Sequence, residues 1–453
     1  MAMEGSSLSV GRFVKIHGLV GAKQHNGKTA IVKTALNEES GRCGVRLVNS
    51  KKGTKLLSIK PSNLTILCSF CKMREETVAC DRCHKVSYCT VQCKKKHWKG
   101  VNNQSGVPNC HMAWCVPTNF EMEVPSQAIG DANVGDQAFD KVSQYLQLAA
   151  DIGNSGRRSE EREMMRKLVA VDKLQPAAWH NLFLSNSELA IMAERYFPEK
   201  YDELANEAIV ALGTVINLLV SEEVRGQVDG PIVQMENAVI KTIKVKAIDF
   251  LDACMKGKRG KDDKELGRIA TCLIGSQLLF VRRDEPLYKL NLSAGFCFQK
   301  LMEYEKAVEQ FQMCCVPSID VYYYHAALGQ IPQCLLSMAL YEEDRSAADR
   351  LEKLNEAITK FQEAIEVYKK DENEPMGLPA HKSQYYLARC YYNKNSLMNL
   401  FAQRGEISYS AEEKKECQSM MNDVITAAYQ GAVAERDQAT ISELRGLQQM
   451  PFS

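Results

Sequence analysis

The pattern of apolar and polar positions changes sharply along the chain. Up to about residue 66, short runs rich in β-branched residues alternate with turn formers, and this pattern predicts β-strands. The strand candidates are residues 12–16, 29–32, 44–48 and 55–59. Four or five short strands at this spacing predict a small curled sheet or barrel-like domain over residues 1–66.

From about residue 137 to the end, apolar residues recur at spacings of three and four, which is the period of an α-helix. The interruptions are short and carry Gly, Pro or charged residues. They fall at residues 153–156, 226–231, 256–261 and 371–379. Helices that follow one another without strands predict a mainly α chain, with an all-α domain over 137–453. A linker that contains Pro and Gly precedes it at 117–136.

One stretch of this helical part carries a repeat-like pattern. Its residues are, in chain order, Asn291, Ala294, Gly295, Phe298, Ala307, Phe311 and Pro317. The order resembles the tetratricopeptide repeat (TPR), a pair of antiparallel helices. Small residues at Gly295 and Ala307 would let the two helices approach closely. Weaker echoes occur at 179–182, 357–364 and 387–391. The resemblance implies a TPR-like repeat array, and an irregular helical bundle is the alternative.

Composition and charge are those of an ordinary globular protein. Of the 453 residues, 45% are apolar and 25% are charged, and the formal net charge is +1. The net charge is therefore too small to attract the chain to nucleic acid or anionic lipid. The apolar stretch 269–281 is shorter than the about 20 residues that a bilayer requires. The first seven residues lack the features of a secretory signal. We expect an intracellular protein, cytoplasmic or nuclear, that does not bind membranes.

The seventeen cysteines are unevenly distributed. Eight lie between Cys68 and Cys115, whereas the others stand in apolar surroundings that predict small buried side chains. Seven of the eight form close pairs, together with one histidine. The pairs are Cys68 with Cys71, Cys80 with Cys83, Cys89 with Cys93, and His111 with Cys115. Eight paired ligands suffice for two closed tetrahedral zinc sites, because short Cys-x2-Cys and x3 spacings let both side chains reach one ion.

The order of these pairs, with Tyr88 before Cys89 and Trp98 after Cys93, resembles the MYND family of zinc fingers over residues 67–116. The resemblance implies cross-bracing, in which the first and third pairs bind one ion and the second and fourth bind the other. The first set is then Cys68, Cys71, Cys89 and Cys93. The second set is Cys80, Cys83, His111 and Cys115. Since all four ligands of each site come from the protein, both Zn²⁺ ions are expected to be structural and not catalytic.

Two departures from the family pattern bear on the site. Lys94 stands where the family has a Gln associated with peptide contact, and the stretch from Trp98 to His111 is longer than usual. His97 or Cys110 could therefore replace His111 as a ligand, although His111 is preferred. The family also implies that a short proline-containing peptide lies against the helix that presents Trp98. The alternative is that Trp98 only covers the zinc core.

The sequence disfavours two other classes of function. A run of lysines begins at Lys94, but the net charge of the finger is modest and the family is known for binding peptides. A chromatin- or RNA-associated regulator is therefore the alternative and not the first choice. A SET-type lysine methyltransferase would need an Asn-His-Ser-Cys-like segment, and none follows the finger. The sequence predicts a non-enzymatic, zinc-binding adaptor that binds protein partners.

Overall fold

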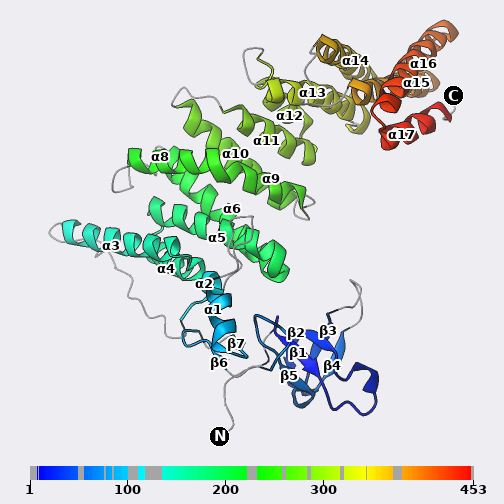
Figure 1. Cartoon of the computed structure of the whole chain (residues 1–453). Coiled ribbons are helices and arrows are strands. Elements are labelled where there is room, and N and C mark those ends of the chain that lie inside the picture. The colour runs from blue at the N-terminus through cyan, green and yellow to red at the C-terminus, as the bar shows by residue number, and fades with distance from the viewer. Residues whose placement is uncertain are drawn as a thin grey trace. The chain divides into compact units, whose positions relative to one another are not determined.

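The computed structural model (Figure 1) describes residues 8, 10–48, 56–75, 78–83, 86–99, 111–117, 135–221, 232–257, 262–282, 287–316, 321–342, 344–370 and 380–449. The chain divides into two compact units, residues 1–235 and 236–453. The first unit contains a sheet, the cysteine-rich finger and several long helices, and the described residues of the second are helical. The mainly α fold class is thus confirmed. The predicted linker, 117–136, lies largely outside the described residues.

Five short strands form an antiparallel sheet in the order β4-β3-β2-β1-β5. They are β1 (Phe13–Ile16), β2 (Thr29–Asn37), β3 (Arg42–Leu47), β4 (Leu57–Ile59) and β5 (Leu64–Ile66). Side chains two residues apart point to the same face of a strand. Val14 and Ile16 of β1 therefore meet Ala30 and Val32 of β2, and these buried side chains form the core of the sheet.

The sheet is curled because its two edge strands are joined by a short connection. β4 and β5 stand at opposite ends of the strand order, yet only residues 60–63 separate them. The edges of a flat five-stranded sheet would be about 19 Å apart. Five extended residues reach at most about 18 Å, and the 3-10 turn Pro61–Asn63 shortens this path. The predicted small curled sheet is confirmed. β4 and β5 are not paired in the described residues, so the barrel is not closed.

The finger follows β5 directly. Its elements are β6 (Val78–Ala79), β7 (Ser87–Tyr88), α1 (Val91–Lys99) and α2 (His111–Trp114). Thr90 caps α1, since its Oγ1 accepts a hydrogen bond of 3.1 Å from the N–H of Cys93. Tyr88 is fully buried, and its buried neighbours are the cysteines of the finger. The core of this module therefore consists mostly of candidate metal ligands.

The first unit continues with the long helices α3 (Gly135–Asn154), α4 (Arg158–Val171), α5 (Pro176–Tyr196) and α6 (Pro198–Val220). Pro176 and Pro198 start their helices, as proline favours the first turn. By length and composition α6 could cross a membrane, and it is the only described helix that could. However, 56% of its most apolar window is buried inside the protein. The apolar character of α6 is explained by its packing against α5.

The second unit is a series of helices, and the boundary between the units falls within the first of them. They are α8 (Ile232–Thr242), the π-helix Ile243–Ala247, α9 (Ile248–Lys256), α10 (Asp263–Val281), α11 (Tyr288–Lys300), α12 (Tyr304–Gln312), α13 (Val321–Tyr341), α14 (Ala347–Lys370), α15 (Ala380–Gln403), α16 (Ala411–Ala434) and α17 (Gln438–Gln449). From α10 onward each helix packs against the next, and α11, α13, α15 and α17 also contact one another in turn. Such a continuous layer of alternate helices is typical of a repeat array.

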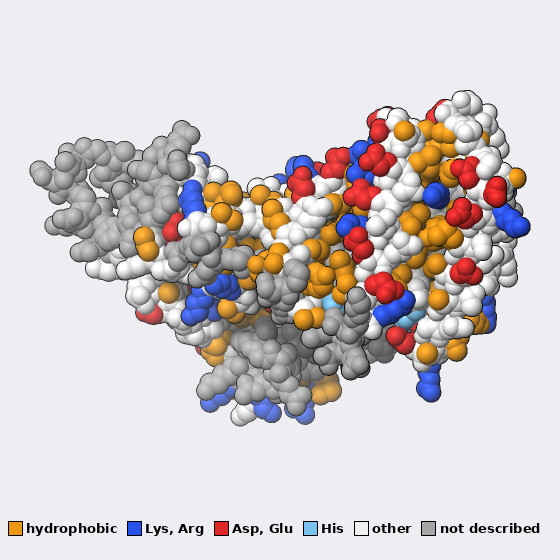
Figure 2. Space-filling view, turned by 90° about the horizontal axis from the view of Figure 1, so that it is seen from above, with side chains coloured by type: hydrophobic (Ala, Val, Ile, Leu, Met, Phe, Trp, Pro, Cys, Tyr) orange, Lys and Arg blue, Asp and Glu red, His pale blue; other side chains and the backbone are white. Residues whose placement is uncertain are grey.

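The α11–α12 hairpin has the packing expected from its sequence. A Cβ atom added at Gly295 would lie 2.5 Å from Cε1 of Phe311, so the missing side chain makes room for this ring. Ala307 and Phe311 are fully buried, and Phe298 is nearly so. The TPR-like pattern is therefore confirmed here, while Pro317 lies outside the described residues. On the face drawn in Figure 2, hydrophobic side chains form strips flanked by acidic ones.

Candidate metal centre

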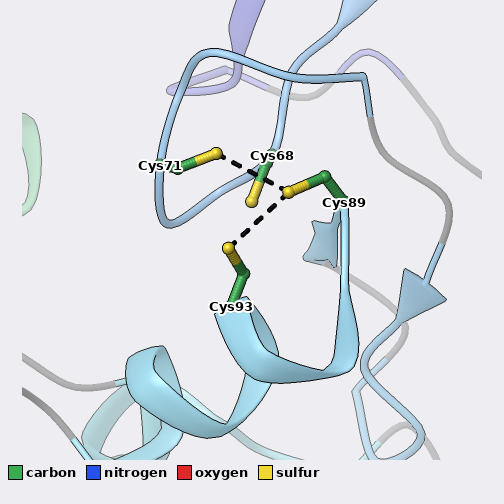
Figure 3. A group of neighbouring side chains, drawn as sticks. All are labelled: Cys68, Cys71, Cys89 and Cys93. Atoms are coloured by element: carbon green, nitrogen blue, oxygen red, sulfur yellow. Dashed lines mark hydrogen bonds between the residues drawn. The ribbon is translucent and has the colours of Figure 1, made fainter.

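The first cluster contains four cysteines, Cys68, Cys71, Cys89 and Cys93, whose side chains converge (Figure 3). The Sγ atom of Cys89 lies 3.7 Å from that of Cys71 and 3.6 Å from that of Cys93. All four sulfur atoms lie within 4.8 Å of one another. Tetrahedral Zn²⁺ with bonds of about 2.3 Å requires sulfur atoms about 3.8 Å apart. The donor set and its spacing fit one zinc ion.

Local hydrogen bonds hold the first pair of this cluster in a tight turn. The N–H of Lys72 donates to the carbonyl of Cys68 at 2.9 Å, and the N–H of Cys68 donates to the carbonyl of Arg74 at 2.8 Å. Lys72 has a φ of 59°, a left-handed conformation that reverses the chain direction. The second pair is placed by the capped first turn of α1. Short-range structure therefore preorganises both pairs.

The second cluster contains Cys80, Cys83, His111 and Cys115, and all four are buried. Nε2 of His111 lies 3.3 Å from Sγ of Cys80 and 3.4 Å from Sγ of Cys83. The Sγ atoms of Cys80 and Cys115 are 3.9 Å apart. A tetrahedral zinc site requires about 3.6 Å between nitrogen and sulfur ligands. This cluster also fits one zinc ion, and its members are those that the MYND resemblance implied.

His97 lies beside the second cluster and is not a member of it. Its Nδ1 is 3.1 Å from the hydroxyl of Tyr88, and its ring stacks on His111 at 5.7 Å. Burial, followed by the nearby His111, lowers the pKa of His97 to about 4. The neutral ring of His97 thus packs against the ring of the ligand His111. Cys110, the other alternative ligand, lies outside the described residues.

The close packing of the thiols shifts their pKa values in both directions, because neighbouring sulfurs compete for protons: burial raises the pKa of Cys89, and hydrogen bonding to Cys80 raises that of Cys115. Burial tends to raise the pKa of Cys71, but hydrogen bonds from the backbone of Met73 and Arg74 outweigh it and lower that pKa to about 7. Hydrogen bonds from Cys115 and Cys83 hold the pKa of Cys80 well below its usual range. Since protons and zinc compete for the same sulfurs, zinc affinity should fall as the pH is lowered.

Trp98 is half-buried and packs against the core of the finger. Its ring meets that of His111 edge-on at 5.8 Å, and the guanidinium of Arg82 lies 5.7 Å from the ring centre. Lys94, which replaces the Gln of the family, forms an ion pair with Asp81. One face of the Trp98 ring therefore covers the second cluster, and part of the side chain remains exposed to solvent.

The finger is packed against the sheet through the residues around its first cluster. The guanidinium of Arg12 lies 3.4 Å from Oγ of Ser69 and 3.5 Å from Oγ of Ser87. The ammonium group of Lys72 lies 4.2 Å from the ring centre of Phe13. Arg12 is itself only 8% exposed. These contacts join the sheet and the finger into one packed structure.

The finger also packs against the helices that follow it. Arg82, between Cys80 and Cys83, donates a hydrogen bond of 2.9 Å to Glu160 at the start of α4, where the carboxylate is nearly buried. The ring of Trp114 in α2 meets that of Phe197, just before α6, at 5.1 Å. No local sequence pattern indicates these contacts. Glu160 is one acidic residue in a first helical turn, where carboxylates are common on exposed helices.

The comparisons with known proteins agree with the geometry of the finger. Residues 68–102 match the family model of the MYND finger. That segment includes the first three cysteine pairs, whereas His111 and Cys115 lie beyond it and join the second cluster through the fold. The search of curated proteins found no match. The chain thus contains a MYND-type zinc finger with two clusters, each able to bind a zinc ion.

Among solved structures, the chain is similar to one described as the crystal structure of the P58(IPK) TPR domain. The two share 13% sequence identity, the TM-score is 0.16, and the match covers 68% of this chain and 97% of that chain. This likeness carries no argument about binding. The TPR-like assignment follows from the α11–α12 hairpin and from the layer of alternate helices.

Proposed function

We propose that this protein is an adaptor, in which a zinc-stabilised finger and a helical repeat array bind protein partners inside the cell. The observation that carries the proposal is the closed donor set of both clusters. Each has four protein ligands, which complete the tetrahedral shell of zinc and leave no position for a substrate or an activated water. Zinc in such a site stabilises a binding surface, and MYND and TPR-like modules generally mediate protein–protein interactions.

The finger offers a binding face along α1. Val91 is 49% exposed, Lys95 and Lys96 are exposed, and Trp98 is half-buried at the end of the helix. An aromatic side chain fixed on one side by packing can anchor a peptide at a low entropic cost. We propose that a short proline-containing peptide docks here, with Trp98 as its anchor.

The helical array offers a second surface. A crevice of about 430 Å³ opens between α14, α15 and α16. Ile365, Leu387 and Val424 contribute apolar surface, and the carboxylates of Glu366 and Asp423 lie beside it. We propose that this mixed apolar and polar lining receives a side chain of a partner. In the proposed function the finger and the array bind different parts of a partner.

The experiment that tests the finger as a docking site begins with a peptide library displayed on phage and selected on the intact protein. Selected peptides should be enriched in proline. Affinities are then measured by titration calorimetry for the wild type and for Trp98→Ala. Loss of an anchor aromatic typically costs about 2 kcal/mol or more, so the substitution should weaken binding at least about thirtyfold.

The zinc content of the same samples shows whether Trp98 anchors the peptide or covers the second zinc cluster. If Trp98→Ala keeps two zinc ions and loses binding, Trp98 is the anchor. If zinc and binding are lost together, its role is to cover the second cluster. Unchanged binding would leave recognition to the helical array. Val210→Ala is a control, because it shortens an exposed side chain of α6 that belongs neither to the proposed face nor to the two clusters.

We further propose that the protein has no methyltransferase activity, although MYND fingers occur in some SET-type enzymes. Incubation of the full chain with labelled S-adenosylmethionine and a panel of histones and peptides should give only background labelling. A zinc-depleted sample serves as the control for nonspecific signal. Reproducible labelling, or saturable binding of the methyl donor, would contradict the adaptor assignment.

A further inference from the structure

The two clusters differ in burial and in the parts of the chain that surround them. All four residues of the second cluster are buried, whereas three of the four in the first are only partly buried. In each cluster, some residues that are next to the ligands in the chain make contacts with a neighbouring part of the protein. The neighbouring part is the sheet for the first cluster and the helices α4 and α6 for the second.

The second cluster is connected to the helices through both of its ligand pairs. Met112 and Trp114 stand between His111 and Cys115, which are both ligands. A Cβ atom at Gly156, just before α4, would lie 2.8 Å from Cε of Met112. The methyl group of Met112 therefore packs directly against Gly156. The ammonium group of Lys200 in α6 lies 5.2 Å from the ring centre of Trp114.

The other ligand pair of this cluster makes a charged contact. Arg82, between Cys80 and Cys83, reaches Glu160, which is only 4% exposed and also receives Arg157 at 3.2 Å. A buried carboxylate is tolerated only when it is paired, and Arg82 of the finger supplies one of the two guanidinium partners of Glu160. The conformation of the loop from Cys80 to Cys83 decides where Arg82 points.

We propose that the second zinc site is the joint that fixes α4 and α6 to the finger, while the first zinc site fixes the finger to the sheet. Zinc at the second site holds His111 and Cys115 together and so sets the direction of Met112 and Trp114. At the first site, Ser69 lies between Cys68 and Cys71 and contacts Arg12. This inference goes beyond the adaptor function and does not depend on it.

Zinc binding and the docking of the finger to its neighbours are thermodynamically linked, so the proposal can be tested without replacing a zinc ligand. If zinc binding favours docking, docking must favour zinc binding by the same factor. Trp114→Ala and the milder Glu160→Gln weaken docking to the helices and leave all eight ligands intact. Both should weaken zinc binding at the second site about fivefold or more, the usual lower range of such coupling. Arg12→Gln should do the same at the first site only.

The measurement uses the full chain loaded with two equivalents of zinc and titrated with a chromophoric chelator. Cysteine alkylation followed by mass spectrometry identifies the cluster that opens. In Trp114→Ala and Glu160→Gln, Cys80, Cys83 and Cys115 should become alkylated at lower chelator concentration than in the wild type. The cysteines of the first cluster should keep their wild-type protection. In Arg12→Gln the order should be reversed.

Glu203→Gln is the matched control, because Glu203 of α6 pairs with Arg162 and Arg166 of α4 and with none of the described residues of the finger. It should leave both sites unchanged. The proposal is overturned if the docking variants release both ions together, if they release neither more readily, or if Glu203→Gln has the same effect. Because Glu160→Gln removes no side-chain volume, general unfolding of the finger would not explain a selective result.

Discussion

At the residue scale, Gly295 sets the distance between α11 and α12. A Cβ atom at this position would overlap the ring of Phe311, which is fully buried. Alanine normally favours a helix over glycine by up to about 1 kcal/mol. Overpacking of a core costs about 1–3 kcal/mol. We therefore expect Gly295→Ala to lower the free energy of unfolding of the second unit, as measured by urea denaturation followed by circular dichroism.

Gly267 provides the control for this substitution. It lies inside α10, and nothing within 4 Å would meet an added Cβ atom. Gly267→Ala should therefore raise the unfolding midpoint, in line with helix propensity alone. If Gly295→Ala and Gly267→Ala both stabilise the protein, the ring of Phe311 can move at no cost in free energy. The close approach of α11 and α12 is then not required.

Individual residues also show what a sequence can and cannot predict. The repeat pattern predicts that small residues at Gly295 and Ala307 let α11 and α12 approach closely, and the ring of Phe311 lies against Gly295. The zinc ligands were likewise found through their spacing. In contrast, the pair Arg82 and Glu160 spans 78 positions. No local pattern indicates which of many surface charges meet, because that depends on how the finger and α4 are packed.

At the scale of elements, α17 depends on a cap that also connects it to α15. Asp437 precedes α17, and its carboxylate accepts hydrogen bonds from the backbone and the hydroxyl of Thr440 at 3.1 and 2.9 Å. Nε2 of the buried His381 in α15 lies 3.1 Å from the same carboxylate. The Thr440 backbone, followed by His381, holds the pKa of Asp437 well below its usual range.

The lowered pKa predicts the pH dependence of this contribution. A carboxylate with a lowered folded-state pKa stabilises the fold above its unfolded pKa of about 3.9 and loses this effect as the pH falls through the folded value. Asp437→Asn should cost about 0.3–1 kcal/mol at pH 7, because asparagine retains a cap acceptor but lacks the negative charge at the N-terminus of α17. The difference from the wild type should shrink below about pH 4.

Urea denaturation at a series of pH values measures this difference. Asp423→Asn, which changes an exposed aspartate of α16, serves as the control and should have little effect at any pH. A constant difference between Asp437→Asn and the wild type from pH 7 to pH 2 would show that the charge of Asp437 is not involved.

Four strands of the sheet and the helical character of the chain after the finger could be predicted, because each has a local signature. The strands of the sheet follow β-branched runs, and the helices follow the three- and four-residue period. The strand order and the contacts among alternate helices were not predictable in this way, since they depend on which surfaces meet after folding. The curled sheet was expected, but a closed barrel is not formed, because β4 and β5 do not pair in the described residues.

At the scale of the whole molecule, the finger connects parts of the first unit that differ in architecture. Its first cluster adjoins the sheet, and its second adjoins α4 and α6. A finger of this size has too little apolar surface to fold alone, so metal binding supplies part of its folding free energy. The second unit, with its own helical core, does not share this dependence.

Native mass spectrometry tests most directly whether the chain binds two zinc ions in two interleaved sites. After EDTA dialysis and refilling with zinc, the wild type should carry two ions. Cys80→Ala should carry at most one, with the finger unfolded and the far-UV signal of the helices retained. One ion or none in the wild type, or two ions in Cys80→Ala, would contradict the cross-braced arrangement.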